Sequence, residues 1–247
     1  MHDLVIRNAH LVDGTGAPGR PAAIAVSDGV ITEVAPDITG NAQRTIDAQG
    51  MVVTPGFVDI HTHFDGQATW DPILAPSSQH GVTSIVMGNC GVGFAPAKPS
   101  DSAHDWLIGL LEGVEDIPGT ALAEGLSWDW ETFPDYIAAL QRREWTMDVG
   151  TQVAHAPLRA YVMGERGADP NEVPSADELN TMTRAVREGL RAGALGFTTS
   201  RTYIHRTKDG APLGTRFAGI DELAALTSAL TDENMGVIQL ISDAYLS

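Results

Sequence analysis

Several features that would assign the chain to a specialised class are scarce. A single cysteine among 247 residues excludes an intramolecular disulfide framework. The chain has 15 basic and 32 acidic residues, for a net charge of −17, so the composition offers no basic surface to bind a nucleic-acid backbone. No apolar run approaches the ~20 residues of a membrane span, and residues 1–8 lack a signal-peptide pattern. We therefore expect a cytoplasmic protein without nucleic-acid or membrane partners.

The first fifty residues are predicted to form short strands. Two apolar runs flank Asp28-Gly29, the pair typical of a two-residue hairpin turn. This region is too small to be a stable domain of its own. We assign residues 1–53 to part of a small β lobe and residues 54–247 to a second domain.

Beyond residue 51, apolar runs alternate with helical patterns. Ser175 and Glu178 have capping-box spacing for a helix that ends at Gly193, and Thr132 with Asp135 makes a weaker cap. A third helix is predicted between the glycines at 219 and 236. The apolar runs read as strands buried on both faces. They cover residues 52–60, 82–87, 149–153, 194–198 and 237–241.

This alternation predicts an α/β fold with a parallel sheet, either open or closed into a barrel. A closed (β/α)₈ barrel needs eight strands and typically ~250 residues for itself. About five barrel-type strands are expected here, so we predict the first part of a truncated barrel.

The strongest local signal is His61-Thr62-His63, which follows the apolar run 52–60. Residues at i and i+2 on a strand point to the same side, so both imidazoles can reach one cation at the strand's carboxyl end. Cys90 follows the next predicted strand within Gly88-Asn89-Cys90-Gly91. A buried, inert thiol is the usual fate of a lone cysteine. Beside the two histidines, a zinc thiolate is favoured instead.

These motifs and three others resemble the amidohydrolase superfamily and, within it, the N-acyl-D-amino-acid deacylases. The resemblance extends over nearly the whole chain. The matching segments are residues 4–63, His80-Gly81-Val82-Thr83, Gly88-Asn89-Cys90-Gly91, Glu112-Gly113-Val114-Glu115-Asp116-Ile117-Pro118 and Gly193-Ala194-Leu195-Gly196-Phe197-Thr198-Thr199-Ser200.

The resemblance implies a TIM-like barrel beside a β-sandwich lobe made of both chain ends. It implies one or two Zn²⁺ ions, held by His61, His63 and Cys90 with later histidines, and a catalytic Asp on the eighth strand. Many relatives bridge two metals with a carboxylated lysine. The lysines here, Lys98 and Lys208, lie in expected loops, so Cys90 is the better bridging candidate.

The chain also departs from the family pattern. Where the strand-five histidine is expected, it reads Val237-Ile238-Gln239-Leu240-Ile241-Ser242-Asp243, in which Asp243 offers an oxygen ligand instead. The later ligands and the general-base Asp are expected beyond Ser247. We therefore expect the 247 residues alone to be inactive.

Three other residues are candidates for supporting roles. His155 ends the third expected strand and either orients substrate or is a hydrogen-bonded structural histidine. Arg201 and Tyr203 follow the fourth strand, where barrel loops build the site. Arg201 would pair with a substrate carboxylate, although a solvated loop arginine is the commoner case.

The expected reaction is zinc-assisted hydrolysis of a linear amide in a small N-acyl amino acid, and the resemblance implies the D configuration. One alternative is a cyclic-amide hydrolase of the hydantoinase or dihydroorotase type, which a carboxylated lysine would favour. The other is a non-catalytic homologue with an assembly role, which the missing strand-five histidine keeps open. The acyl chain, side-chain preference and oligomeric state are not predicted.

Overall fold

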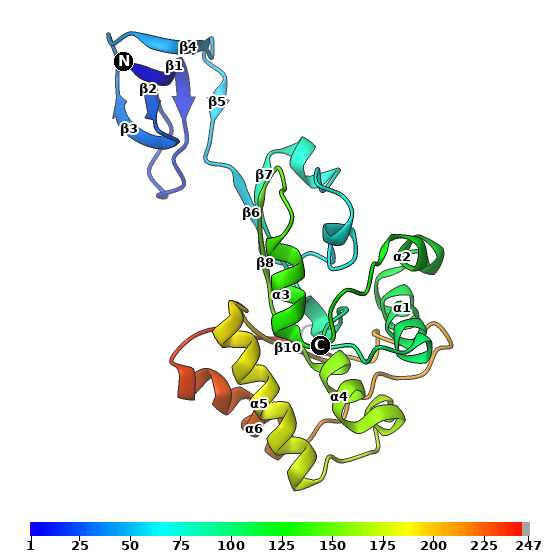
Figure 1. Cartoon of the computed structure of the whole chain (residues 1–247). Coiled ribbons are helices and arrows are strands. Elements are labelled where there is room, and N and C mark those ends of the chain that lie inside the picture. Colours follow the sequence, from blue (N-terminus) through cyan, green and yellow to red (C-terminus); the bar gives the residue numbers. More distant parts are fainter. Residues whose placement is uncertain (244–247) are drawn as a thin grey trace. The chain divides into compact units, whose positions relative to one another are not determined.

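The computed structural model of the protein describes residues 1–243 (Figure 1). Its contacts divide the chain into two compact units, one of residues 1–57 and one that begins at Val58. No helix in residues 1–243 has the length and apolar character needed to cross a membrane.

The first unit is built on one five-stranded mixed sheet, in the order β3-β2-β1-β4 with β5 also paired to β1. β2 is antiparallel to β1 and β3, whereas β4 and β5 run parallel to β1. Within residues 1–57 no second sheet faces it, so the sandwich lobe stays a prediction. The strands are β1 (His2–Leu11), β2 (Arg20–Ser27), β3 (Val30–Ala35), β4 (Ala42–Asp47) and β5 (Val52–Val53).

The predicted hairpin at Asp28-Gly29 is confirmed, and both residues have positive φ, at 51° and 73°. Alternate residues of β2 then enter two small cores on opposite faces of the sheet. Ala22 and Ile24 belong to one, and Ala23 and Ala25 to the other. Period-two alternation thus gives a sheet with apolar residues on both sides.

The second unit contains strands that pair in chain order, and the pairs β7–β8, β9–β10 and β10–β11 are parallel. β6 pairs with β7 and β7 with β8, while β9 pairs with β10 and β10 with β11. The backbone N–H of Leu195, directly before β10, donates to Thr151 O at the end of β8 at 2.8 Å. This bond links the two sets of strands. The strands are β6 (Phe57–Asp59), β7 (Val82–Met87), β8 (Asp148–Thr151), β9 (Val153–Ala154), β10 (Gly196–Arg201) and β11 (Val237–Ser242).

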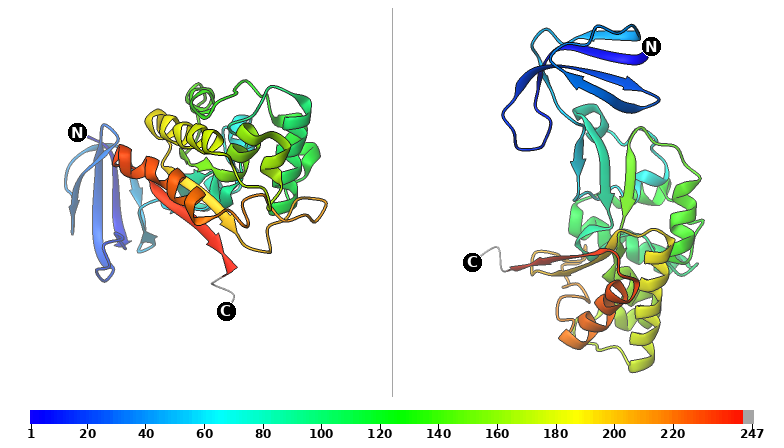
Figure 2. Two further views of the ribbon diagram at one scale, coloured as in Figure 1. Left: turned by 90° about the horizontal axis from the view of Figure 1, so that it is seen from below. Right: turned by 90° about the vertical axis from the view of Figure 1, so that its left-hand side faces the viewer.

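Helices fill the connections between these strands, and Figure 2 shows α5 and α6 side by side. Ion pairs of Arg187 and Arg191 with Glu233 join these two helices at their surface. The helices are α1 (Asp101–Glu115), α2 (Gly119–Gly125), α3 (Phe133–Gln141), α4 (His155–Met163), α5 (Ala176–Ala192) and α6 (Ile220–Glu233).

Both predicted capping boxes are confirmed, at Thr132 for α3 and at Ser175 for α5. Two predicted boundaries were wrong. α6 ends at Glu233, ahead of Gly236, because Asn234 already adopts the left-handed conformation at φ 50°. The run 52–60 is two strands, β5 and β6, separated by residues 54–56, where Pro55 lacks the N–H needed for a continuous ladder.

Candidate metal centre

His61 and His63 lie directly after β6, on either side of a residue that ties the segment to β7. Thr62 donates its backbone N–H to Val86 O at 3.0 Å and its hydroxyl to the same oxygen at 2.9 Å. The two imidazole rings are left 5.6 Å apart, centroid to centroid. The i and i+2 spacing therefore directs both rings to one region, as predicted.

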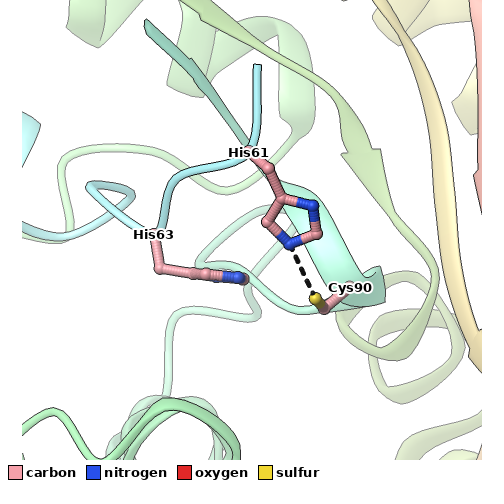
Figure 3. A group of neighbouring side chains, drawn as sticks. All are labelled: His61, His63 and Cys90. Carbon is pink, nitrogen blue, oxygen red and sulfur yellow. Dashed lines mark hydrogen bonds between the residues drawn. The ribbon is translucent and has the colours of Figure 1, made fainter. Parts of the chain in front are cut away.

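Cys90 sits on a tight turn after β7, with a left-handed φ of 56°. Glycine is required on both sides of it. A Cβ at Gly91 would lie 2.9 Å from Thr199 Cα, and one at Gly88 would collide with the backbone oxygen of Gln152. This close packing brings the Cys90 Sγ to 3.1 Å from His61 Nε2 (Figure 3).

The ligand atoms of His61, His63 and Cys90 all lie within 4.8 Å of one another. Tetrahedral zinc with bonds of ~2.0–2.3 Å holds its ligand atoms about 3.4 to 3.7 Å apart, so small side-chain shifts would close the cluster. Both ring nitrogens of His63 are buried and make no hydrogen bond within residues 1–243, although Nε2 lies 3.1 Å from Glu115 Oε1. Buried polar atoms are rarely left unpaired, and a cation is the partner that this donor set fits.

Buried amide side chains hold the two ligand-bearing segments in place. Asn89 donates to Thr62 O at 3.0 Å and to Val86 O at 2.8 Å, and its Oδ1 accepts from Gln152 and Gln239. Gln239 of β11 also accepts from Cys90 N–H at 3.1 Å and contacts His61 Nδ1 at 3.0 Å. A glutamine thus contacts the cluster from the strand where the family pattern expects a histidine.

The electrostatics of the cluster favour a bound cation. Burial, followed by the charges of His61 and His205, lowers the pKa of His63 to about 3, so its nitrogens stay available as ligands. Burial, Glu115 and Asp65 raise the pKa of Cys90 to about 12. A thiol in such surroundings ionises only when a cation compensates the charge, which zinc does.

Glu115 and His205 join Cys90 in a second group whose ligand atoms also lie within 4.8 Å of one another. Burial raises the pKa of Glu115 to about 7, and its Oε1 lies 3.1 Å from His63 Nε2. Neither residue was predicted as a site residue. Glu115 lay in a segment used only for the family resemblance, and in the segment after β10 the prediction favoured Arg201 over His205.

The structure does not bring His155 to this cluster. It is fully buried at the start of α4, with Nδ1 2.8 Å from Thr199 Oγ1 and Nε2 2.9 Å from Glu222 Oε1. Arg159 donates two further hydrogen bonds to the same carboxylate. His155 therefore occupies the hydrogen-bonded setting that was one of its two interpretations.

The other candidates lie at the carboxyl ends of β10 and β11. Arg201 is exposed, and Tyr203 is 50% exposed. Asp243 accepts from Thr202 Oγ1 at 2.6 Å and from the Tyr203 N–H at 3.0 Å. Its carboxylate is thus used to tie the segment after β10 to the end of β11, and it belongs to neither group of potential ligands in residues 1–243. The general-base Asp predicted beyond Ser247 lies outside the described residues.

Comparison with known sequences gives one family. Residues 44–246 match the amidohydrolase family. The chain is 35% identical over 205 residues to the N-acyl-D-glutamate deacylase of Alcaligenes xylosoxydans xylosoxydans, covering 81% of this chain and 38% of that protein. It is 34% identical over 203 residues to an uncharacterized protein of Mycobacterium bovis, covering 80% and 32%.

Comparison with solved structures agrees. The N-acyl-D-glutamate deacylase of Bordetella bronchiseptica, complexed with zinc and a phosphonate inhibitor, superposes with a TM-score of 0.76 at 30% identity, covering 97% of this chain and 44% of that one. A D-aminoacylase crystal structure gives 0.75 at 30% identity, covering 96% and 44%. The chain therefore spans less than half the length of each of these relatives.

Proposed function

The chain belongs to the amidohydrolase family, and on that premise we propose that it forms part of a zinc-dependent hydrolase that cleaves N-acyl-D-amino acids. The products are a carboxylate and a free D-amino acid. The observation that carries the proposal is the convergence of His61, His63 and Cys90, whose ligand atoms lie within 4.8 Å of one another.

The residues of this chain would bind and position the metal. His61, His63 and Cys90 hold one ion. Gln239 fixes the positions of His61 and the Cys90 turn relative to each other through its hydrogen bonds. Zinc bound there would polarise the scissile amide carbonyl and lower the pKa of water. The buried amide of Asn89 fixes the turn without adding charge.

The substrate class rests on the relatives that act on N-acyl-D-amino acids, among them the N-acyl-D-glutamate deacylase. Such substrates carry a carboxylate that a guanidinium can bind in a bidentate manner. Arg201 is the last residue of β10, which pairs with the strand that carries Gln239, and Tyr203 lies just beyond it. Both are exposed, so we propose them as substrate-binding residues. His155 would support the site indirectly, through Thr199.

A cyclic-amide substrate is less well supported. Relatives with a carboxylated lysine would need that lysine beside the metal ligands. Lys98 is exposed, and the Lys208 side chain lies against Gly109 of α1.

Hydrolysis of N-acetyl-D-glutamate, its L enantiomer and hydantoin tests the proposal, with the full-length product of the reading frame loaded with zinc. We expect cleavage of the D substrate alone and loss of at least about 100-fold in kcat/KM for His61→Asn. Asn180→Ala, on the exposed face of α5, is the matched control. Zinc binding without cleavage of any N-acyl amino acid would refute the substrate, and absence of zinc binding would refute the enzyme.

A further inference from the structure

A cavity of about 330 Å³ lies between the amino end of α1 and the carboxyl end of α4. Its volume is near the lower limit for small-molecule sites, so it suits a compact ligand. Leu107 forms part of its wall, and Glu115, which approaches the metal cluster, lies eight residues farther along α1, a rise of ~12 Å. This α1–α4 cavity is therefore separate from the residues that would hold the metal.

The buried part of the α1–α4 cavity is apolar. Pro96, Ala97, Leu107 and Pro157 are buried in its wall, and Trp106 adds a partly buried indole ring. Burial of an apolar group is favourable roughly in proportion to the area that it removes from water. An aromatic group gains further when it meets another ring edge to face or offset. The wall therefore favours a ligand with an apolar group, above all an aromatic one.

Positive charge lies on the α1 side of the cavity. The exposed Lys98 side chain lines it and has no ion-pair partner within residues 1–243. Ser100 caps α1 and lines the same side. The amino end of a helix carries partial positive charge and unpaired N–H groups, so it adds to the charge of the lysine. A carboxylate is the ligand group that this side favours.

Negative charge lies on the α4 side. Gly164 ends α4 and Glu165 follows it, and both residues line the cavity. Glu165 is exposed and likewise has no ion-pair partner in the described part of the chain. The carboxyl end of a helix carries partial negative charge, which reinforces the charge of the glutamate. This side therefore favours a cationic group, such as an ammonium.

We propose that the α1–α4 cavity binds a free amino acid with an apolar side chain. Its carboxylate pairs with Lys98 and the start of α1, its ammonium pairs with Glu165, and its side chain packs against Trp106. A simple carboxylic acid or a simple amine would leave one charged side of the cavity unmatched. The proposal does not depend on the metal centre, although the ligand belongs to the same class as the amino-acid product of the proposed hydrolysis.

Calorimetric titration of the zinc-loaded 247-residue chain tests the proposal with four probes. They are D-phenylalanine, L-phenylalanine, 3-phenylpropionate, which lacks the ammonium, and phenethylamine, which lacks the carboxylate. The cavity sets no preference for handedness, so we expect at least one enantiomer to bind. It should bind about 10-fold more tightly than either analogue, because each analogue forfeits one hydrogen bond between charged groups.

Variants of the two charged residues separate their roles. Lys98→Gln should abolish the preference for phenylalanine over phenethylamine and keep the preference over 3-phenylpropionate. Glu165→Gln should do the reverse. Arg44→Gln and Glu144→Gln are the matched controls, because they remove the same charges at exposed positions outside the cavity. Both controls should bind all probes as the wild type does.

Two further variants place the ligand in the cavity. Ala160 is a partly buried residue of its wall on α4, so Ala160→Leu should fill the apolar part and weaken phenylalanine at least about 10-fold. Phenylalanine should also change the tryptophan fluorescence of the wild type, and Trp106→Phe should remove that change. Circular dichroism checks that each variant is folded.

Three results would overturn the proposal. The first is a wild-type chain that binds neither enantiomer. The second is equal affinity for phenylalanine and its two analogues, which would leave no role for the paired charges. The third is binding that Ala160→Leu leaves unchanged and His61→Asn abolishes, which would place the amino acid at the metal centre. The proposed hydrolysis fails separately, through absence of zinc binding or of cleavage.

Discussion

Asn89 illustrates what single residues add to the centre. It is fully buried, and each of its amide groups is used to join β7, the segment after β6 and β11. The sequence predicted His61, His63 and Cys90 because coordinating side chains at strand ends form a recognisable pattern. Asn89 and Gln239 have no such pattern, since an amide reveals its role only when its tertiary partners are known.

Replacing Asn89 by alanine should destabilise the second unit and weaken zinc together. The change leaves Thr62 O and the Gln152 amide without partners in a buried site, at a cost of about 1–3 kcal/mol for each group. As the loss of an outer partner, it should reduce zinc affinity about 10–100-fold. Urea denaturation and chelator titration measure the two effects, with Asn180→Ala as control. Zinc affinity equal to the wild type would show that Asn89 does not position Cys90.

At the scale of elements, the sequence predicted features set by local patterns but not those set by tertiary contacts. The capping boxes of α3 and α5 were predicted because Ser or Thr with an acid three residues later is a local pattern. α1 was not predicted, although Ser100 caps it. Helix α1 carries Glu115 at its carboxyl end and Gly113 beneath the segment after β10. The role of both residues depends on contacts with segments that are distant in the sequence.

Ser175→Ala should destabilise α5 by about 1 kcal/mol, because the hydroxyl accepts from Glu178 N–H and closes the capping box. Ser175→Asp, which keeps an acceptor at the cap, should restore most of that loss. Urea midpoints of the two variants measure the difference. Equal midpoints for alanine and aspartate would mean that the cap contributes nothing.

The network between α4, α6 and β10 should make stability depend on pH. Burial lowers the pKa of His155 below 6.5, so as pH falls through 6.5 the unfolded chain takes up a proton that the folded chain does not. Burial raises the pKa of Glu222, but its hydrogen bonds with His155 and Arg159 outweigh this and lower it, which extends the loss of stability below pH 4.5. Both groups therefore stabilise the fold most at neutral pH.

His155→Gln should flatten this dependence. Between pH 6.5 and 5 the wild type should lose up to about 1.4 kcal/mol per pH unit more than the variant, the value for one proton. Urea denaturation across that range measures it. Other histidines of lowered pKa, such as His63, remain in both proteins, so the comparison isolates His155. Parallel pH profiles would show that His155 is not the group that titrates.

At the scale of the whole molecule, the two units should respond differently to metal. The change from hairpin patterning to buried runs places the expected boundary at residue 53, and the contacts of the structure divide the chain after residue 57. The parallel order of the strands was likewise predictable. The truncated barrel stays a prediction, because closure depends on the register of every strand.

Chelation should destabilise the second unit and leave the first unchanged. Zinc at 100 times its Kd stabilises a folded site by about 2.7 kcal/mol per ion, and every candidate ligand lies beyond residue 57. All five tryptophans also lie there, at positions 70, 106, 128, 130 and 145, so their fluorescence reports this unit alone. Its thermal midpoint should fall with EDTA and recover with zinc. In His61→Asn, EDTA should have a smaller effect. A midpoint insensitive to EDTA in the wild type would contradict metal binding, because a ligand that binds the folded state must stabilise it.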